Sequence, residues 1–176
     1  FMGETWVTGD AGGTEYNAKT FGDKRYEIPM INSYGHPLPV LNGALQSYGR
    51  KFAAKMLKTD FSDGEDVISM ELAGAYNREK SKANSLVRTF TYDRQAKSVT
   101  VSDSVAFDGE GSFSVPIITC GTLEKAADGN YILTVGKDAA KQKIAVEIKT
   151  GGIPFEMSSE RIENINRISP NRYAIT

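Results

Sequence analysis

The chain has 176 residues, of which 40% are hydrophobic and 24% charged, which is ordinary for one soluble globular domain with a sizeable core. Its formal net charge is -1 and its basic residues are scattered singly, so composition points neither to a nucleic-acid partner nor to an anionic membrane surface. The single cysteine, Cys120, excludes an internal disulfide, and no apolar run approaches the roughly 20 residues of a membrane span.

The start of the chain, residues 1–8, predicts a short strand that ends at a glycine-rich turn, residues 9–13 (GDAGG). A strand at the very first residue suggests that further chain precedes it, and no signal-peptide pattern is visible. Residues 14–24 mix polar and aromatic positions, so we expect an irregular segment there.

The next stretch, residues 25–43, is unusually rich in residues that carry chemistry. It holds the only histidine, His36, together with two of the eight tyrosines and three of the six prolines. We therefore expect residues 1–43 to bear a site and residues 44–176 to form its scaffold of strands.

Apolar and polar residues alternate from residue 44 onward, which predicts half-buried strands. A long strand is expected at 46–59, a hairpin loop at 60–65 and a returning strand at 66–72. Further strands are predicted at 85–92, 98–107, 112–119, 131–135, 144–148 and 172–175, the last of them as an edge strand.

The clearest hairpin joins residues 85–92 to residues 98–107, and its register can be predicted. If Phe90 faces Val101, every apolar residue of one row faces an apolar residue of the other. The two charged residues in these rows, Arg88 and Asp103, then also face each other. A slip by one residue would turn one row to the wrong face, so this register is favoured.

Roughly ten short strands with turn signals between them, and no helical periodicity over three turns, indicate an all-β fold, an antiparallel two-layer β-sandwich. We expect one domain over residues 1–176. Cys120 follows an apolar run, so we expect it to be a buried small residue.

His36 lies in a polar turn, residues 32–37 (NSYGHP), 26 positions after Asp10. It is either a metal ligand or proton-transfer group, or a loop histidine hydrogen-bonded to backbone. A zinc site takes three or four protein ligands, so Asp10 and His36 alone would leave it a ligand short.

Arg25, Tyr26 and Glu27 form a candidate acid–base cluster, because a nearby cation can lower the pKa of a tyrosine and make it a base. The alternative for Tyr26 is a half-buried strand aromatic, and Tyr16, Tyr34 and Asn32 share this ambiguity. Arg25 suits a substrate carboxylate, although surface arginines commonly have no such role.

Several short motifs together resemble the β-sheet region of heparinase II/III-like polysaccharide lyases. The resemblance covers roughly residues 4–120, and its most specific part is the Asp-Gly turn followed by the Asn-Ser-x-Gly-His element. The motifs that carry it are GDAGG at 9–13, RYE at 25–27, NSYGHPLPV at 32–40, TDF at 59–61, RTFTY at 88–92 and VTVSD at 99–103.

The resemblance implies an α/α-toroid domain upstream of this chain and a β-elimination reaction on uronic-acid-containing polysaccharides. It implies a zinc ion held by Asp10, His36 and an earlier histidine that would lie upstream of Phe1. It implies Tyr26 as a catalytic residue, with Tyr16 as the fallback, while Arg25, Asn32 and Tyr16 are candidates for binding substrate. Pro37 stands where many relatives have asparagine, so the same substrate does not follow.

On this reading the intact protein is a periplasmic or secreted lyase acting on an acidic polysaccharide, and the isolated chain is inactive because the other catalytic groups belong to the toroid. Two alternatives stay open: a non-catalytic carbohydrate-binding or accessory sandwich, and a structural module that packs on a helical domain. Neither a nucleic-acid nor a membrane partner is expected.

Overall fold

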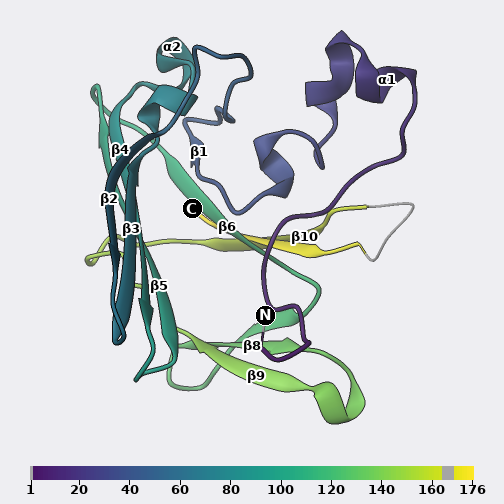
Figure 1. Ribbon diagram of the computed structural model, residues 1–176, viewed down its shortest axis with the longest axis vertical. Helices are drawn as coiled ribbons and strands as arrows, with labels where there is room; N and C mark the ends of the chain where they lie inside the picture. The colour runs from purple at the N-terminus through teal and green to yellow at the C-terminus, as the bar shows by residue number, and fades with distance from the viewer. Residues whose placement is uncertain (1, 164–168) are drawn as a thin grey trace. The chain divides into compact units, whose positions relative to one another are not determined.

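The computed structural model describes residues 2–163 and 169–176. Within them lie eleven strands in three antiparallel sheets, with only two four-residue α-helices and a few short 3-10 helices (Figure 1). The prediction of an all-β antiparallel sandwich is therefore confirmed. No helix in the described part of the chain is long and apolar enough to cross a membrane.

The chain divides into two compact units. Unit 1 comprises Phe1–Pro39 and Ser114–Thr176, and unit 2 comprises Val40–Phe113. The prediction of one domain over residues 1–176, with a site segment and a scaffold segment, stays a prediction. All the predicted site residues belong to unit 1.

Unit 2 is built on a four-stranded antiparallel sheet with the order β2-β3-β4-β5. Its core consists of Leu41, Leu72, Ala75, Tyr76, Ala83 and Leu86, which are buried. The elements of this unit are β1 (Val40–Leu41), β2 (Lys55–Phe61), β3 (Glu65–Glu71), η3 (Ala73–Ala75), α2 (Arg78–Ser81), β4 (Ala83–Asp93) and β5 (Ser98–Phe107).

The predicted register of the β4–β5 hairpin is confirmed. Phe90 pairs with Val101 and Arg88 pairs with Asp103. Arg88 donates from Nε and Nη2 to the two carboxylate oxygens of Asp103, each at 2.7 Å. This is the bidentate geometry that a guanidinium and a carboxylate favour, and both side chains are almost fully buried.

The long strand predicted at 46–59 is wrong over its first half. β2 begins only at Lys55, and the preceding residues form a turn in which Gly49 has a φ of 107°. That backbone conformation is readily adopted only by glycine and ends the extended run. Ser47 instead donates its backbone N–H to Ala75.

Unit 1 contains the strands β6, β11 and β10, which are adjacent in that order in one sheet, and the three-stranded sheet β7-β8-β9, and the two groups share a core. Leu123, Leu133 and Val135 of the second sheet are buried, and Ile117 and Tyr173 of the first sheet pack against this cluster. The strands are β6 (Phe113–Thr119), β7 (Thr122–Lys125), β8 (Tyr131–Val135), β9 (Gln142–Val146), β10 (Met157–Arg161) and β11 (Asn171–Ile175). A short 3-10 helix, η4 (Asp138–Ala140), precedes β9.

The prediction that residues 172–175 form an edge strand is wrong. β11 lies between β6 and β10, and Tyr173 pairs with Ile117 on one side and with Ser159 on the other. β10 is largely exposed and has few apolar residues, so hydrophobic alternation does not predict it as a strand. Its pairing with β11 could therefore not be predicted.

The strand predicted at residues 1–8 does not form either. Met2 and Thr5 exchange backbone hydrogen bonds across a tight turn at Gly3. The following segment carries α1 (Ala18–Phe21), η1 (Asp23–Glu27) and η2 (Ser33–Gly35). Cys120 is exposed, so its predicted burial is wrong as well.

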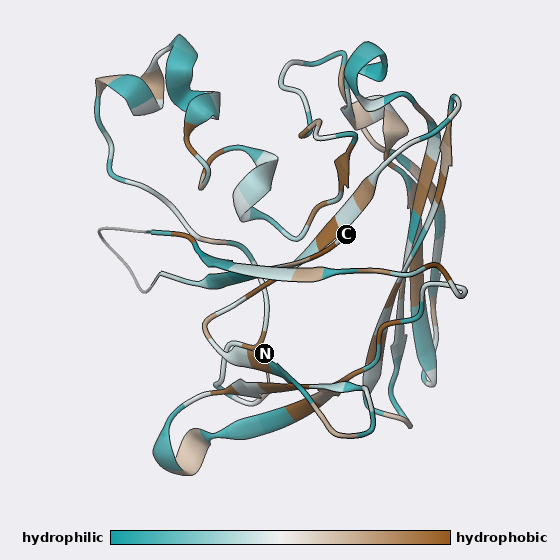
Figure 2. Cartoon of the chain, turned by 180° about the vertical axis from the view of Figure 1, so that it is seen from behind, coloured by the Kyte–Doolittle hydropathy of each residue, from teal (hydrophilic) through white to brown (hydrophobic). Residues whose placement is uncertain are grey.

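Hydropathy distinguishes the parts of this segment (Figure 2). The stretch through α1 and η1 is largely hydrophilic, whereas residues 28–31, which follow it, are hydrophobic. Met30 packs against a small cluster in which Ala11 and Ile118 are buried. The two loops that carry the predicted metal ligands therefore have an apolar support beneath them.

Candidate functional site

The turn that carries Asp10 is fastened to the end of β6. The hydroxyl of Thr8 and the backbone N–H of Gly9 both donate to the carbonyl oxygen of Ile118, at 2.8 and 3.2 Å. The Thr119 hydroxyl donates to the carbonyl of Val7 at 2.6 Å. These bonds join residues more than a hundred positions apart and fix where the turn begins.

Within this turn, Asp10 Oδ1 accepts a hydrogen bond of 2.8 Å from the backbone N–H of Gly12. Such an Asx turn orients the carboxylate, because one oxygen is used internally and the other is left to point outward. The next residue, Ala11, is buried and donates its N–H to the carbonyl of Gly35 at 2.7 Å. The Asp10 turn is thus tied directly to the loop that carries His36.

The His36 loop folds tightly around Gly35. Gly35 donates its N–H to the carbonyl of Pro29 at 2.9 Å, and a Cβ at this position would lie 2.5 Å from the same oxygen. The loop therefore requires glycine here for close approach of backbone to backbone. Asn32 caps the short helix η2, since its Oδ1 accepts from the N–H of Tyr34 at 2.8 Å.

These two loops bring Asp10 and His36 together. Asp10 Oδ2 lies 3.8 Å from His36 Nδ1, and both side chains are partly exposed. The separation is too long for a hydrogen bond, so the facing oxygen and nitrogen do not satisfy each other directly. Two ligands of a tetrahedral zinc ion, each at about 2.0–2.2 Å, stand about 3.4 Å apart, close to the spacing seen here.

The described residues contain no group of three or more His, Cys, Asp or Glu side chains that could hold a metal ion. Asp10 and His36 are therefore an oxygen and a nitrogen donor that fit two positions of a zinc site. A zinc site built on this pair would need a third ligand from outside the described part of the chain.

Arg25 and Tyr26 lie together on η1 and not on a strand, which removes the alternative of Tyr26 as a half-buried strand aromatic. The Arg25 guanidinium carbon is 5.2 Å from the centre of the Tyr26 ring, within cation–π range. Asn32 Nδ2 donates to the carbonyl of Tyr26 at 3.0 Å, so the cluster is linked to the His36 loop. The Tyr26 side chain is exposed.

Tyr16 is 83% exposed, and its ring stacks on Phe21 with 5.4 Å between centroids. This pair flanks α1, which begins with a capping box in which Asn17 and Thr20 exchange hydrogen bonds. Tyr16 therefore belongs to the α1 turn, whereas Tyr26 is connected through Asn32 to the loop of His36. The geometry favours Tyr26 over Tyr16 as the tyrosine of this site.

Sequence reasoning did not identify two residues that contact the His36 loop, Arg172 and Glu160. Arg172 is almost fully buried and stacks on the ring of Tyr34, with 4.1 Å from the guanidinium carbon to the ring centre. Tyr34 donates a short hydrogen bond from its hydroxyl to Glu160. The available signal was a charged residue on the buried face of β11, because Arg172 lies on the same face as Ala174.

The environment of Tyr34 keeps its hydroxyl protonated. Burial raises the pKa of Tyr34 above its ordinary value of 10.0, and the hydrogen bond to the Glu160 carboxylate raises it further, although the Arg172 charge acts in the opposite direction. Tyr34 is therefore a hydrogen-bond donor at neutral pH and not a base.

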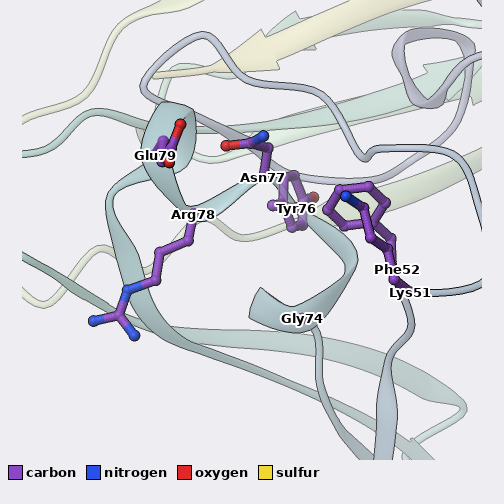
Figure 3. A pocket seen from close by; sticks show the side chains of 7 residues that line it. All are labelled: Lys51, Phe52, Gly74, Tyr76, Asn77, Arg78 and Glu79. Atoms are coloured by element: carbon purple, nitrogen blue, oxygen red, sulfur yellow. The ribbon is translucent and has the colours of Figure 1, made fainter.

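Unit 2 carries a separate open groove with a volume of about 400 Å³ (Figure 3). Phe52 and Tyr76 lie next to each other in it and Asn77 adjoins Tyr76, whereas the Arg78 side chain points away from the two rings. Lys51 also contributes, with its Nζ 5.1 Å from the centre of the Phe52 ring. Sequence reasoning did not single out this combination of cations, an amide and aromatic rings.

The sequence matches no family model, and no curated protein matches it. The residues of the Asp10–His36 site and its geometry are therefore the observations on which a function can be argued.

Proposed function

We propose that this chain is the β-sandwich part of a heparinase II/III-like polysaccharide lyase, and that residues 8–36 form one wall of its active site. The observation that carries the proposal is the approach of Asp10 to His36, 3.8 Å apart on two loops joined by a backbone hydrogen bond. These are the residues that the family resemblance assigns to a zinc site.

Asp10 and His36 would hold the zinc ion, with a histidine from upstream chain as the third ligand. When bound, zinc supplies a fixed positive charge that holds the two loops in place. Asp10 is suited to this because Oδ1 is oriented by Gly12, which leaves Oδ2 directed toward His36.

β-Elimination of a uronate requires its carboxylate to be neutralised, a proton to be removed beside that carboxylate, and the leaving oxygen to be protonated. Arg25 carries a guanidinium suited to the carboxylate. Tyr26 would exchange the proton with substrate, a role supported by its exposed side chain and by its neighbour Arg25. Asn32 holds the backbone of Tyr26 and so orients both groups.

The remaining catalytic groups would come from a helical toroid domain, so the isolated chain should not turn over substrate. The substrate class is an acidic polysaccharide or oligosaccharide, and the location is periplasmic or secreted.

The metal site can be tested in tag-free chain through its single histidine. Zinc should shift or broaden the imidazole resonances of His36, and Asp10→Asn should abolish the effect. Asp23→Asn, a carboxylate change on η1, is the matched control and should leave the zinc response unchanged. An identical zinc response in wild type and Asp10→Asn would contradict the site.

Catalysis can be tested in the chain preceded by its toroid, with ultraviolet absorbance of the unsaturated uronate product as the readout. Tyr26→Phe should reduce kcat by about 10²–10⁴-fold, the usual contribution of a general acid or base. Tyr16→Phe should retain activity. Full activity in Tyr26→Phe would show that another group transfers the proton.

A second candidate function is non-catalytic glycan binding by the groove of unit 2. Lys51 and Arg78 supply two positive charges against the one negative charge of Glu79, and Phe52 supplies a ring, which together suit an acidic saccharide. Titration with an acidic oligosaccharide should then saturate without turnover, and Lys51→Met with Arg78→Met should weaken binding. Binding that survives this double change but is lost in Arg25→Met would place the glycan in unit 1.

A further inference from the structure

Arg172 and Glu160 contact the His36 loop at Tyr34. They are direct cross-strand partners in the β10–β11 pair. Arg172 Nη1 lies 3.3 Å from Glu160 Oε1, and the same oxygen accepts the hydroxyl proton of Tyr34. Arg172 Nε donates to the backbone carbonyl of Tyr34, also at 3.3 Å.

Tyr34 is thus held at three points: its ring by the guanidinium face, its hydroxyl by Glu160 and its carbonyl by Arg172 Nε. A planar guanidinium can stack on a ring and donate in its own plane at the same time, which the ammonium of a lysine cannot do. The contacts connect residues 126 and 138 positions apart, so they act between the loop and the distant hairpin.

The side chain of Arg172 is only 6% exposed, and the strand pattern places it on the buried side of β11. A buried cation is retained where its partners satisfy it, and here two of its partners belong to the His36 loop or contact it. Arg172 is too deeply buried to bind a substrate carboxylate, and the Tyr34 hydroxyl is already donated to Glu160. Their role is to hold the loop.

We propose that Arg172 and Glu160 are positioning residues that clamp Tyr34 and thereby hold His36 opposite Asp10. His36 follows Tyr34 by two residues, and its N–H bonds back to Ser33 within the same turn. Displacement of Tyr34 would therefore displace the imidazole. The importance of this clamp rests on the proposed function. Its test does not, because the position of the loop can be measured without metal.

The test compares three variants of the chain. Arg172→Met keeps the length of the side chain and leaves Glu160, which is 45% exposed, accessible to water, so this variant should fold. Glu160→Gln removes the carboxylate. Arg161→Met is the matched control, because Arg161 lies on the same hairpin with an exposed side chain.

In metal-free chain, Arg172→Met and Glu160→Gln should speed amide hydrogen exchange in residues 33–36 and shift the His36 imidazole resonances. Exchange in β6 and β11 should stay as in wild type, and Arg161→Met should match wild type throughout. Unchanged exchange and unchanged His36 resonances in Arg172→Met would overturn the clamp. So would equal acceleration in the loop and in β11, since Arg172 would then stabilise the sheet as a whole.

With zinc added, Arg172→Met should bind about 10–100-fold more weakly, the usual effect of losing a group that orients a metal ligand. Wild-type affinity in Arg172→Met would overturn the clamp. If wild-type chain shows no zinc response while the variant still loosens the loop, the clamp stands and the proposed metal site fails.

Discussion

The β4–β5 hairpin of unit 2 and the His36 loop of unit 1 are both organised around a buried arginine, but the two arginines are stabilised differently. Arg88 meets Asp103 directly across a ladder, 15 residues away, with two matched hydrogen bonds. Arg172 divides its donors between a carboxylate on its own hairpin and a backbone carbonyl 138 residues away. The first pair fixes a register, and the second connects a hairpin to a loop.

This difference indicates what each arginine contributes. The Arg88–Asp103 pair lies inside regular structure, so its removal should affect the stability of the sheet. The Arg172 contacts lie at the boundary of regular structure, so their removal should affect the position of a loop. The following changes separate these two consequences.

The largest effect is expected from Asp103→Ala. It leaves the Arg88 charge buried without its carboxylate, a change that typically lowers the free energy of unfolding by about 3–5 kcal/mol. Chemical denaturation measures this free energy of unfolding. The double change Arg88→Met with Asp103→Leu should recover most of the lost stability. The control is Asp60→Ala, which removes an exposed ion pair with Lys58 and should lower the free energy of unfolding by less than about 1 kcal/mol.

Glu71→Ala should lower the free energy of unfolding by about 2 kcal/mol, because three hydrogen bonds to the Glu71 carboxylate are lost. Its Oε1 accepts from the N–H groups of Ala73 and Leu86 and its Oε2 from the Ser85 hydroxyl, each at 2.8 Å. Glu65→Ala, on the exposed end of the same strand, is the control. Equal losses in the two variants would contradict this role.

Glu71 should also make the free energy of unfolding depend on pH. Burial acts to raise the pKa of Glu71, but the hydrogen bonds from Leu86, Ala73 and Ser85 outweigh it, so the pKa lies below its ordinary value of 4.5. A group with a lowered pKa in the folded state stabilises the fold above its unfolded pKa, and this stabilisation is lost as the pH falls through the folded pKa. Glu71→Gln should therefore flatten the stability profile below about pH 4.5.

Gly35→Ala should lower the free energy of unfolding by about 1–2 kcal/mol, less than Asp103→Ala, and should have the largest effect on the site. The added Cβ would lie 2.5 Å from the Pro29 carbonyl, so the loop must shift and carry His36 away from Asp10. The His36 resonances should change strongly and zinc should no longer perturb them. Gly13→Ala is the control, because a Cβ there meets nothing within 4 Å.

The hairpin could be predicted from the sequence, and the site only in part. The register that pairs Arg88 with Asp103 follows from the alternation of apolar and polar residues in the two strands, and the structure confirms it. Asp10, Tyr26 and His36 were identified by residue type and by a family resemblance, which indicate chemistry but not distance. The 3.8 Å approach of Asp10 to His36 depends on the Ala11–Gly35 hydrogen bond, which no local pattern reveals.

The wrong strand predictions depend on features that hydrophobic alternation does not report. The strands expected at residues 1–8 and 46–54 have apolar residues at suitable spacing, but positive φ angles at Gly3 and Gly49 turn the chain there. Residues 171–175 have the pattern of a strand, but that pattern does not predict whether the strand pairs on one side or on both. β10, which makes β11 an inner strand, is too polar to be identified by hydrophobic periodicity.

By itself, then, the sequence determined the all-β class, the β4–β5 register and the residue types of the site, because alternation and turn chemistry act over a few residues. Only the tertiary structure decided that Asp10 faces His36, that Tyr34 lies under Arg172 and that Glu160 receives its hydroxyl proton. These contacts join residues up to 138 positions apart. They exist because β6, β10 and β11 pair in one sheet whose ends support the loops, an arrangement that depends on packing over the whole unit.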